Sequence, residues 1–214
     1  MTTATATALP LRFASADDAE ELARAELYGL LARLWLAPPD AALLDQFKVA
    51  VTQAPQPGGH LESPWEALVA AMRATSVQAA ADEYEALFLG VGKPEVFLYA
   101  SYYRAGFLNE QPLAALRADL RRLGLTRDES TGETEDHVAY LFEVMRYLIA
   151  GDDVAVCNLE QQRRFFRTHL QPWLDALCDA VDAQPRAALW RAVAALTRAF
   201  TQVETQAFDL LEES

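Results

Sequence analysis

Apolar residues recur at the spacing of an α-helix along most of this chain, and this periodicity restricts the possible fold more than any other feature. In the segment 17–36, leucines lie three or four positions apart, and the segment 135–150 repeats the pattern. No stretch alternates apolar and polar residues as a strand does, and no internal repeat is found. A chain of 214 residues that is 52% hydrophobic can build one core. The sequence therefore predicts an all-α, single-domain bundle of about ten helices.

Proline and glycine mark the ends of several expected helices. Pro38 and Pro39 end the first helix, and Gly124 is placed as the C-terminal glycine of another. The segment 90–100 is expected to be an extended connector rather than a strand, because no partner strand is evident. The expected helices cover approximately residues 17–36, 40–53, 64–75, 77–89, 101–108, 111–123, 135–150, 154–168, 173–181 and 185–211.

The N-terminal residues 1–16 are rich in threonine and alanine and are predicted to be a disordered tail, followed by the helical domain over 17–214. This tail lacks the basic start and apolar stretch of a secretory signal, and no apolar segment reaches the length that spans a bilayer. Cys157 and Cys178 lie outside any metal-binding spacing, so both are interpreted as reduced thiols of the core. Together these features predict a cytoplasmic protein without a stable membrane insertion.

The charge balance restricts the possible partners. The formal net charge is -13 at pH 7 and the pI is about 4.6. Proteins that bind nucleic acid or anionic lipid usually present a basic surface, so neither partner is expected here. An acidic surface favours solubility and attracts basic partners, and both explanations fit this composition.

The most unusual local feature is an acidic run at the expected start of the helix 135–150. Glu133, Glu135, Asp136 and His137 are crowded into five positions. Carboxylates near a helix N-terminus are stabilising even without a function, so a structural role is one interpretation. The other is a receptor for guanidinium groups, which paired carboxylates hold through bidentate hydrogen bonds.

Aromatic residues lie close to the acidic run if the connector 90–100 brings them there. Tyr99, Tyr102, Tyr103 and Phe107 could line an apolar groove for a peptide, and ordinary core packing is the alternative for each. Ser101 lies among them and could lie near the acidic run.

Catalytic and metal-binding patterns are not evident. The chain has three histidines, and none follows a glutamate at the Glu-x-x-His spacing of helical di-iron sites. The segment 90–93 lacks the spacing of a phosphate-binding loop, and no Gly-x-Ser-x-Gly elbow surrounds Ser101. No metal, cofactor or catalytic residue is therefore predicted. A small helical metal-dependent hydrolase that uses His137 remains the enzyme alternative, and a structural subunit of a larger complex is a third possibility.

A series of motifs between about Asp82 and Trp173 resembles the TorD/DmsD/NarJ family of cytoplasmic chaperones for molybdoenzymes. The run 133–137 resembles the family signature Glu-Pro-x-Asp-His, with Thr134 in place of the proline and able to cap the helix that follows. The other segments that carry the resemblance are Glu83–Gly90, Tyr99–Tyr103, Leu123–Leu125, Leu141–Met145 and Gln161–Trp173.

The resemblance implies a non-enzymatic, client-specific chaperone. Members of the family bind the twin-arginine leader or N-terminus of a molybdenum oxidoreductase, assist cofactor insertion and delay export. The family's Asp-His pair, associated with leader binding, corresponds to Asp136 and His137. A NarJ-like chaperone, whose client lacks such a leader, is the close alternative, and either a monomer or a segment-swapped dimer is compatible with the family. Together with the acidic run and the aromatic segment beside it, the residues predicted to bind the leader are Tyr99, Ser101, Tyr102, Glu133, Glu135, Asp136 and His137.

Overall fold

The computed structural model describes residues 16–49, 59–90, 92–127 and 132–212. Within these ranges the chain is helical and contains no strand, only an isolated antiparallel bridge between Tyr99 and His137. The predicted all-α fold is thus confirmed. The predicted tail lies outside the described residues except for its last residue, Ala16, where α1 begins. The helices are α1 (Ala16–Leu36), α2 (Ala41–Val49), α3 (Glu62–Ala74), α4 (Val77–Tyr84), α5 (Ala100–Ala105), α6 (Gln111–Arg122), α7 (Val138–Ala150), α8 (Leu159–Phe165), α9 (Gln171–Asp182) and α10 (Leu189–Glu212).

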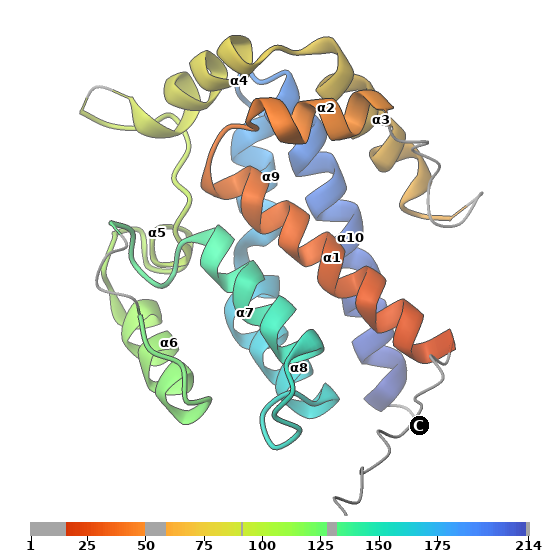
Figure 1. The fold of residues 1–214 in the computed structure, drawn as a ribbon. Coiled ribbons are helices and arrows are strands. Elements are labelled where there is room, and N and C mark those ends of the chain that lie inside the picture. The colour runs from red at the N-terminus through yellow and green to blue at the C-terminus, as the bar shows by residue number, and fades with distance from the viewer. Residues whose placement is uncertain (1–15, 50–58, 91, 128–131, 213–214) are drawn as a thin grey trace, which may run out of the picture.

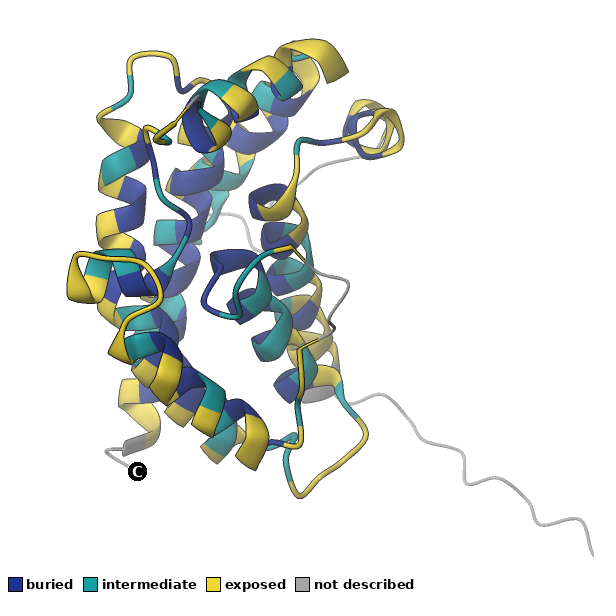
Figure 2. Cartoon of the chain, turned by 90° about the vertical axis from the view of Figure 1, so that its left-hand side faces the viewer, coloured by how far each residue is buried: buried dark blue, intermediate teal, exposed yellow. Residues whose placement is uncertain are grey.

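Two long helices, α1 and α10, organise the core. α1 packs along α7, and α10 packs against α9 and α3 (Figure 1). Three tryptophans of the core, Trp35, Trp173 and Trp190, are fully buried. Figure 2 shows the buried positions along the faces where helices meet and the exposed positions on the outer faces. Burial of these large apolar side chains is the dominant favourable contribution to the stability of the bundle.

Two segments continue a helix with the wider π-helical geometry. Glu85–Leu89 extends α4, and Phe166–Leu170 joins α8 to α9. The predicted helix 77–89 is therefore continuous but changes its hydrogen-bond pattern part of the way along. A π-helical turn inserts an extra residue and rotates the side chains that follow.

Some helix starts differ from the prediction because capping groups lie elsewhere. α8 begins at Leu159 rather than near Val154, because the side chain of Asn158 accepts a hydrogen bond from the N–H of Gln161 and caps it. α10 begins at Leu189 rather than near Pro185. There the carboxylate of Glu83 accepts hydrogen bonds from the N–H groups of Ala188, Leu189 and Trp190. A residue from α4 thus caps α10, a long-range contact that sequence spacing does not show.

The start of α7 has a direct bearing on the candidate site. The prediction placed Glu135 and Asp136 in the first turn of this helix, but α7 begins at Val138 and His137 is its N-cap. The acidic run therefore precedes the helix, where its backbone can pair with another segment.

None of the helices within the described residues has the length and hydrophobicity needed to span a membrane.

Candidate functional site

The connector before α5 lies antiparallel to the acidic run. The N–H of Val138 donates to the carbonyl oxygen of Leu98 at 2.8 Å, and the N–H of Ala100 donates to that of Asp136 at 3.0 Å. Tyr99 and His137 form the bridge between these two bonds. Residues about 38 positions apart in sequence are thereby joined, and Tyr99, Ser101 and the acidic run lie together.

Asp136 is buried and fully hydrogen-bonded. Its side chain Oδ2 accepts a hydrogen bond from the N–H of Ser101 at 2.9 Å, and its Oδ1 accepts one from the hydroxyl of Thr134 at 2.6 Å. Asp136 is only 1% exposed, so it cannot meet a partner without moving. Thr134 was expected to cap α7, but its hydroxyl instead orients Asp136. The carboxylate therefore caps α5 and fixes the acidic run to the connector.

His137 is buried and caps α7. Its Nδ1 accepts a hydrogen bond from the N–H of Ala139 at 3.2 Å, so this nitrogen carries no proton. Burial lowers the pKa of His137 to about 4, although the nearby charges of Glu133 and Asp136 act in the opposite direction. The imidazole is thus neutral at physiological pH and has a structural role in this conformation.

Tyr99 and Tyr102 lie at the edge of the site and are only partly buried. The Tyr99 hydroxyl donates a hydrogen bond to Glu133, and burial together with this carboxylate raises the pKa of the Tyr99 phenol. Tyr102 stacks on Phe97 with ring centroids 4.0 Å apart. Tyr103, also proposed for an aromatic groove, instead stacks on Trp173 and donates its hydroxyl to a backbone carbonyl.

Phe107, the last of the four proposed aromatic residues, is 72% exposed just after α5. Most of its side chain is therefore exposed to solvent in the described structure.

Glu135 makes the strongest ion pair of the site. Arg117 of α6 donates from Nε to Oε1 at 2.9 Å and from its terminal nitrogen to Oε2 at 2.8 Å. The hydrogen bonds from Arg117 lower the pKa of Glu135, although partial burial opposes this shift. The side chain of Glu135 remains 13% exposed and that of Arg117 41% exposed.

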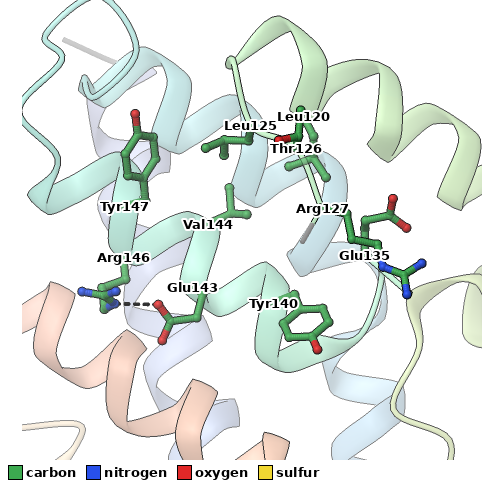
Figure 3. Close-up of a pocket in the computed structure, with 10 residues that line it drawn as sticks. All are labelled: Leu120, Leu125, Thr126, Arg127, Glu135, Tyr140, Glu143, Val144, Arg146 and Tyr147. Carbon is green, nitrogen blue, oxygen red and sulfur yellow. Dashed lines mark hydrogen bonds and ion pairs between the residues drawn. The ribbon is translucent and has the colours of Figure 1, made fainter. Parts of the chain in front are cut away.

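A groove between the end of α6 and α7 adjoins this ion pair. It has a volume of about 310 Å³, within the range of ligand sites in proteins (Figure 3). Leu120, Leu125 and Val144 form its apolar wall, Tyr140 and Tyr147 flank that wall, and Glu135 lies at one end.

Sequence reasoning missed this groove. Tyr140, Val144 and Tyr147 follow helical spacing on α7, but this second apolar stripe adjoins the buried stripe of the same helix. This stripe was the sequence pattern that could have indicated the groove. No sequence pattern identified Arg117 as the partner of Glu135.

Among the residues of the described ranges, no three His, Cys, Asp or Glu side chains are grouped so that they could hold a metal ion.

We expect Asp136→Ala to lower the free energy of unfolding by about 2 kcal/mol, because the N–H of Ser101 would lose a charged acceptor in a buried place. Asp136→Asn retains an acceptor oxygen, so it should lower the free energy of unfolding by less than half of this amount. Urea unfolding followed by circular dichroism measures both. Equal losses for the two variants would mean that charge, and not capping, is the contribution of Asp136 to stability.

Comparison with known proteins assigns the chain to a family. The model of the nitrate reductase delta subunit family matches residues 56–179. The relatives include proteins named "Chaperone protein TorD" from the Ogawa and El Tor Inaba strains of Vibrio cholerae serotype O1. The first is 29% identical over 136 residues, which are 60% of this chain and 62% of the relative. The second is 29% identical over 132 residues, 58% of this chain and 60% of the relative. The matched region thus spans less than two thirds of these relatives, but the family model covers more than half of the chain. The chain therefore belongs to the nitrate reductase delta subunit family, which includes the TorD and NarJ chaperones that its motifs resemble.

Proposed function

We propose that this protein is a cytoplasmic, non-enzymatic maturation chaperone for a molybdenum-containing oxidoreductase. It binds a basic leader or N-terminal segment of the apoenzyme, assists cofactor insertion and delays export. The membership of the family and the name of the relatives support a chaperone. The observation that carries the proposal for this chain is the acidic run, fixed to the connector beside an apolar groove in a protein of net charge -13.

The seven residues of the sequence prediction take two roles in this proposal. Glu133, Glu135, Tyr99 and Tyr102 are partly exposed and contact the client. The carboxylates bind its arginines, and the aromatic rings pack against the neighbouring side chains.

Asp136, His137 and Ser101 are buried and position the contact residues. Asp136 adds a negative charge close to the surface, which strengthens the attraction for a cation without direct contact.

Binding of a synthetic peptide with two consecutive arginines before an apolar stretch tests the proposal. We expect the double variant Glu133→Gln/Glu135→Gln to bind it about tenfold more weakly, because each arginine would then meet a neutral amide in place of a carboxylate. Added salt should weaken binding to the parent protein more than to the variant. Isothermal titration calorimetry measures both effects, and a peptide with lysines in place of the arginines is the matched control.

Two results would contradict parts of the proposal. Equal affinity of the variant and the parent protein would remove Glu133 and Glu135 from the site. Binding of a whole apoenzyme, recovered by affinity purification from the native host, without binding of any arginine peptide would favour the NarJ-like alternative, in which the client lacks a twin-arginine leader.

A further inference from the structure

We propose that Arg117 occupies the place of a client arginine in the client-free protein, and that the guanidinium of the client displaces it from Glu135. This inference rests on the proposed function and deepens it, because it names the contact that the client must replace. Arg117 would then set how much affinity a client arginine can gain at this position.

The geometry of the pair shows that a guanidinium fits Glu135. Arg117 holds both carboxylate oxygens through two parallel hydrogen bonds of 2.9 and 2.8 Å. This fork is specific to arginine, because the lysine ammonium is a point charge that cannot bind in this way. The Arg117 side chain is 41% exposed and that of Glu135 is 13% exposed, so the pair can be reached from solvent. A client arginine can reach this carboxylate fully only when Arg117 leaves it.

Arg117 also balances a second carboxylate. Its hydrogen bonds to Glu135 and the nearby charges of Glu135 and Asp136 raise its pKa. Asp136 is buried, and its hydrogen-bond partners, the N–H of Ser101 and the hydroxyl of Thr134, are neutral. Departure of Arg117 would therefore leave Asp136 without this counter-charge and Glu135 with the nearby charge of Arg127, which also lowers the pKa of Glu135. Such a pair of carboxylates attracts another cation.

The hollows around the pair match an arginine followed by apolar residues. Arg117 and Glu135 line a hollow of about 200 Å³ together with Arg121 and Arg127. The groove of about 310 Å³ shares Leu120, Leu125 and Glu135 with it, and continues along the apolar side of α7 to Val144 (Figure 3). A segment whose arginine binds Glu135 would place its next side chains on this apolar wall. The bidentate place that Arg117 vacates on Glu135 and the apolar groove beyond it thus favour one occupant, the N-terminal segment of the client with an arginine followed by apolar residues.

Release of Arg117 does not require α6 to leave the protein. Leu113 and Leu116 on the same helix are buried. Asp119 of α6 accepts a hydrogen bond from the buried His169 at 2.8 Å, which fixes the helix to the body independently of Glu135. Only the side chain of Arg117 has to move. Partly exposed ion pairs contribute little net free energy, so the competition corresponds to about a fivefold change in affinity.

Calorimetric titration of the twin-arginine peptide into Arg117→Ala tests this inference. We expect the dissociation constant to fall about fivefold relative to the parent protein. Arg191→Ala is the matched control: Arg191 of α10 is exposed, carries the same charge and lines neither hollow. Its removal should change the dissociation constant less than twofold, because Arg191 does not bind Glu135. Adding Glu135→Gln to Arg117→Ala should abolish the gain.

The outcomes separate this inference from the proposed function. Unchanged or weaker binding by Arg117→Ala, with binding by the parent protein intact, would overturn the inference and leave the proposed function standing. An equal gain for both arginine variants would also overturn it, since net charge alone would then explain the effect. Absence of binding by the parent protein and every variant would instead contradict leader binding itself.

Discussion

Replacement of Glu204 by alanine is expected to lower the free energy of unfolding by about 3–5 kcal/mol, because it leaves a partly buried arginine without its counter-charge. Glu204 of α10 is 1% exposed. Arg24 of α1 binds both of its oxygens at 2.8 Å, and the hydroxyl of Tyr28 donates to it at 3.0 Å. Burial acts to lower the pKa of Arg24. The hydrogen bonds to Glu204 and its negative charge together have the larger, opposite effect, so the pKa of Arg24 is raised. The loss of one partner would leave the remaining groups unsatisfied.

This network connects the two long helices to the helix that carries the candidate site. Arg24 also contacts Gln162 of α8, and Gln162 donates to the carbonyl oxygen of Leu148 near the end of α7. α1, α7, α8 and α10 therefore meet at one polar cluster inside an apolar core. Buried polar groups that are all paired stabilise a unique arrangement of helices, and a partly satisfied cluster is costly.

Urea unfolding followed by circular dichroism measures the effect of Glu204→Ala. The matched control is Glu160→Ala, which also removes a helical glutamate paired with an arginine, Arg163, but at a side chain that is 65% exposed. Exposed pairs contribute at most about 1 kcal/mol, so the control should lose far less stability. A loss below about 1 kcal/mol for Glu204→Ala would show that the buried charge of Arg24 finds another partner or water.

Sequence reasoning predicted the helices best where a local signal marks their ends. Pro38 follows α1 closely, and Gly124 follows α6 with a φ of 72°, the left-handed conformation that glycine adopts at little cost. Where the cap comes from a distant residue, the prediction failed. The start of α10 depends on Glu83, about 105 positions earlier, and no local pattern shows such a contact.

The candidate site was only partly predictable for the same reason. The run 133–137 was recognised because charged residues are rarely crowded together, and its proximity to Tyr99 and Ser101 is what the structure shows. The burial of Asp136 was not predictable, because acidic side chains are usually exposed and its partner Ser101 lies 35 positions away. Its position before α7 depends on backbone pairing with the connector, which sequence periodicity does not reveal.

The ion pair of Arg117 with Glu135 was missed for a different reason. Several arginines precede the acidic run in the sequence, but their positions give no indication of which one binds Glu135. Only the packing of α6 beside α7 selects Arg117. A site of this kind needs the three-dimensional structure, because both partners look like ordinary surface residues in sequence.

We expect the protein to lose about 3 kcal/mol of stability between pH 6.5 and pH 4 through the titration of His137. Burial holds the pKa of the folded-state imidazole at about 4, against an ordinary value of 6.5. In this pH range the unfolded chain binds a proton that the folded protein does not, so acid favours unfolding. Stability therefore rises from pH 4 to pH 6.5 and this contribution is constant above that range.

The structural cause of this pH dependence lies at the start of α7. Protonation of Nδ1 removes the acceptor for the N–H of Ala139 and places a charge on a buried ring that contacts the rings of Tyr99 and Tyr140. Glu133 and Asp136 offset part of that cost, but burial outweighs them. Because the acidic run directly precedes His137, loss of this cap should also loosen the carboxylates that we propose bind the client.

Comparison with His137→Asn isolates this contribution, because asparagine is a good N-cap and does not titrate. Burial also lowers the pKa of His169, despite the opposing effect of Asp119, so some acid destabilisation remains in the variant. Urea unfolding at a series of pH values should give a steeper dependence for the parent protein, with the difference confined to the range from about pH 4 to pH 6.5. Identical pH profiles would mean that His137 has the same pKa in the folded and the unfolded protein, so that burial does not lower it.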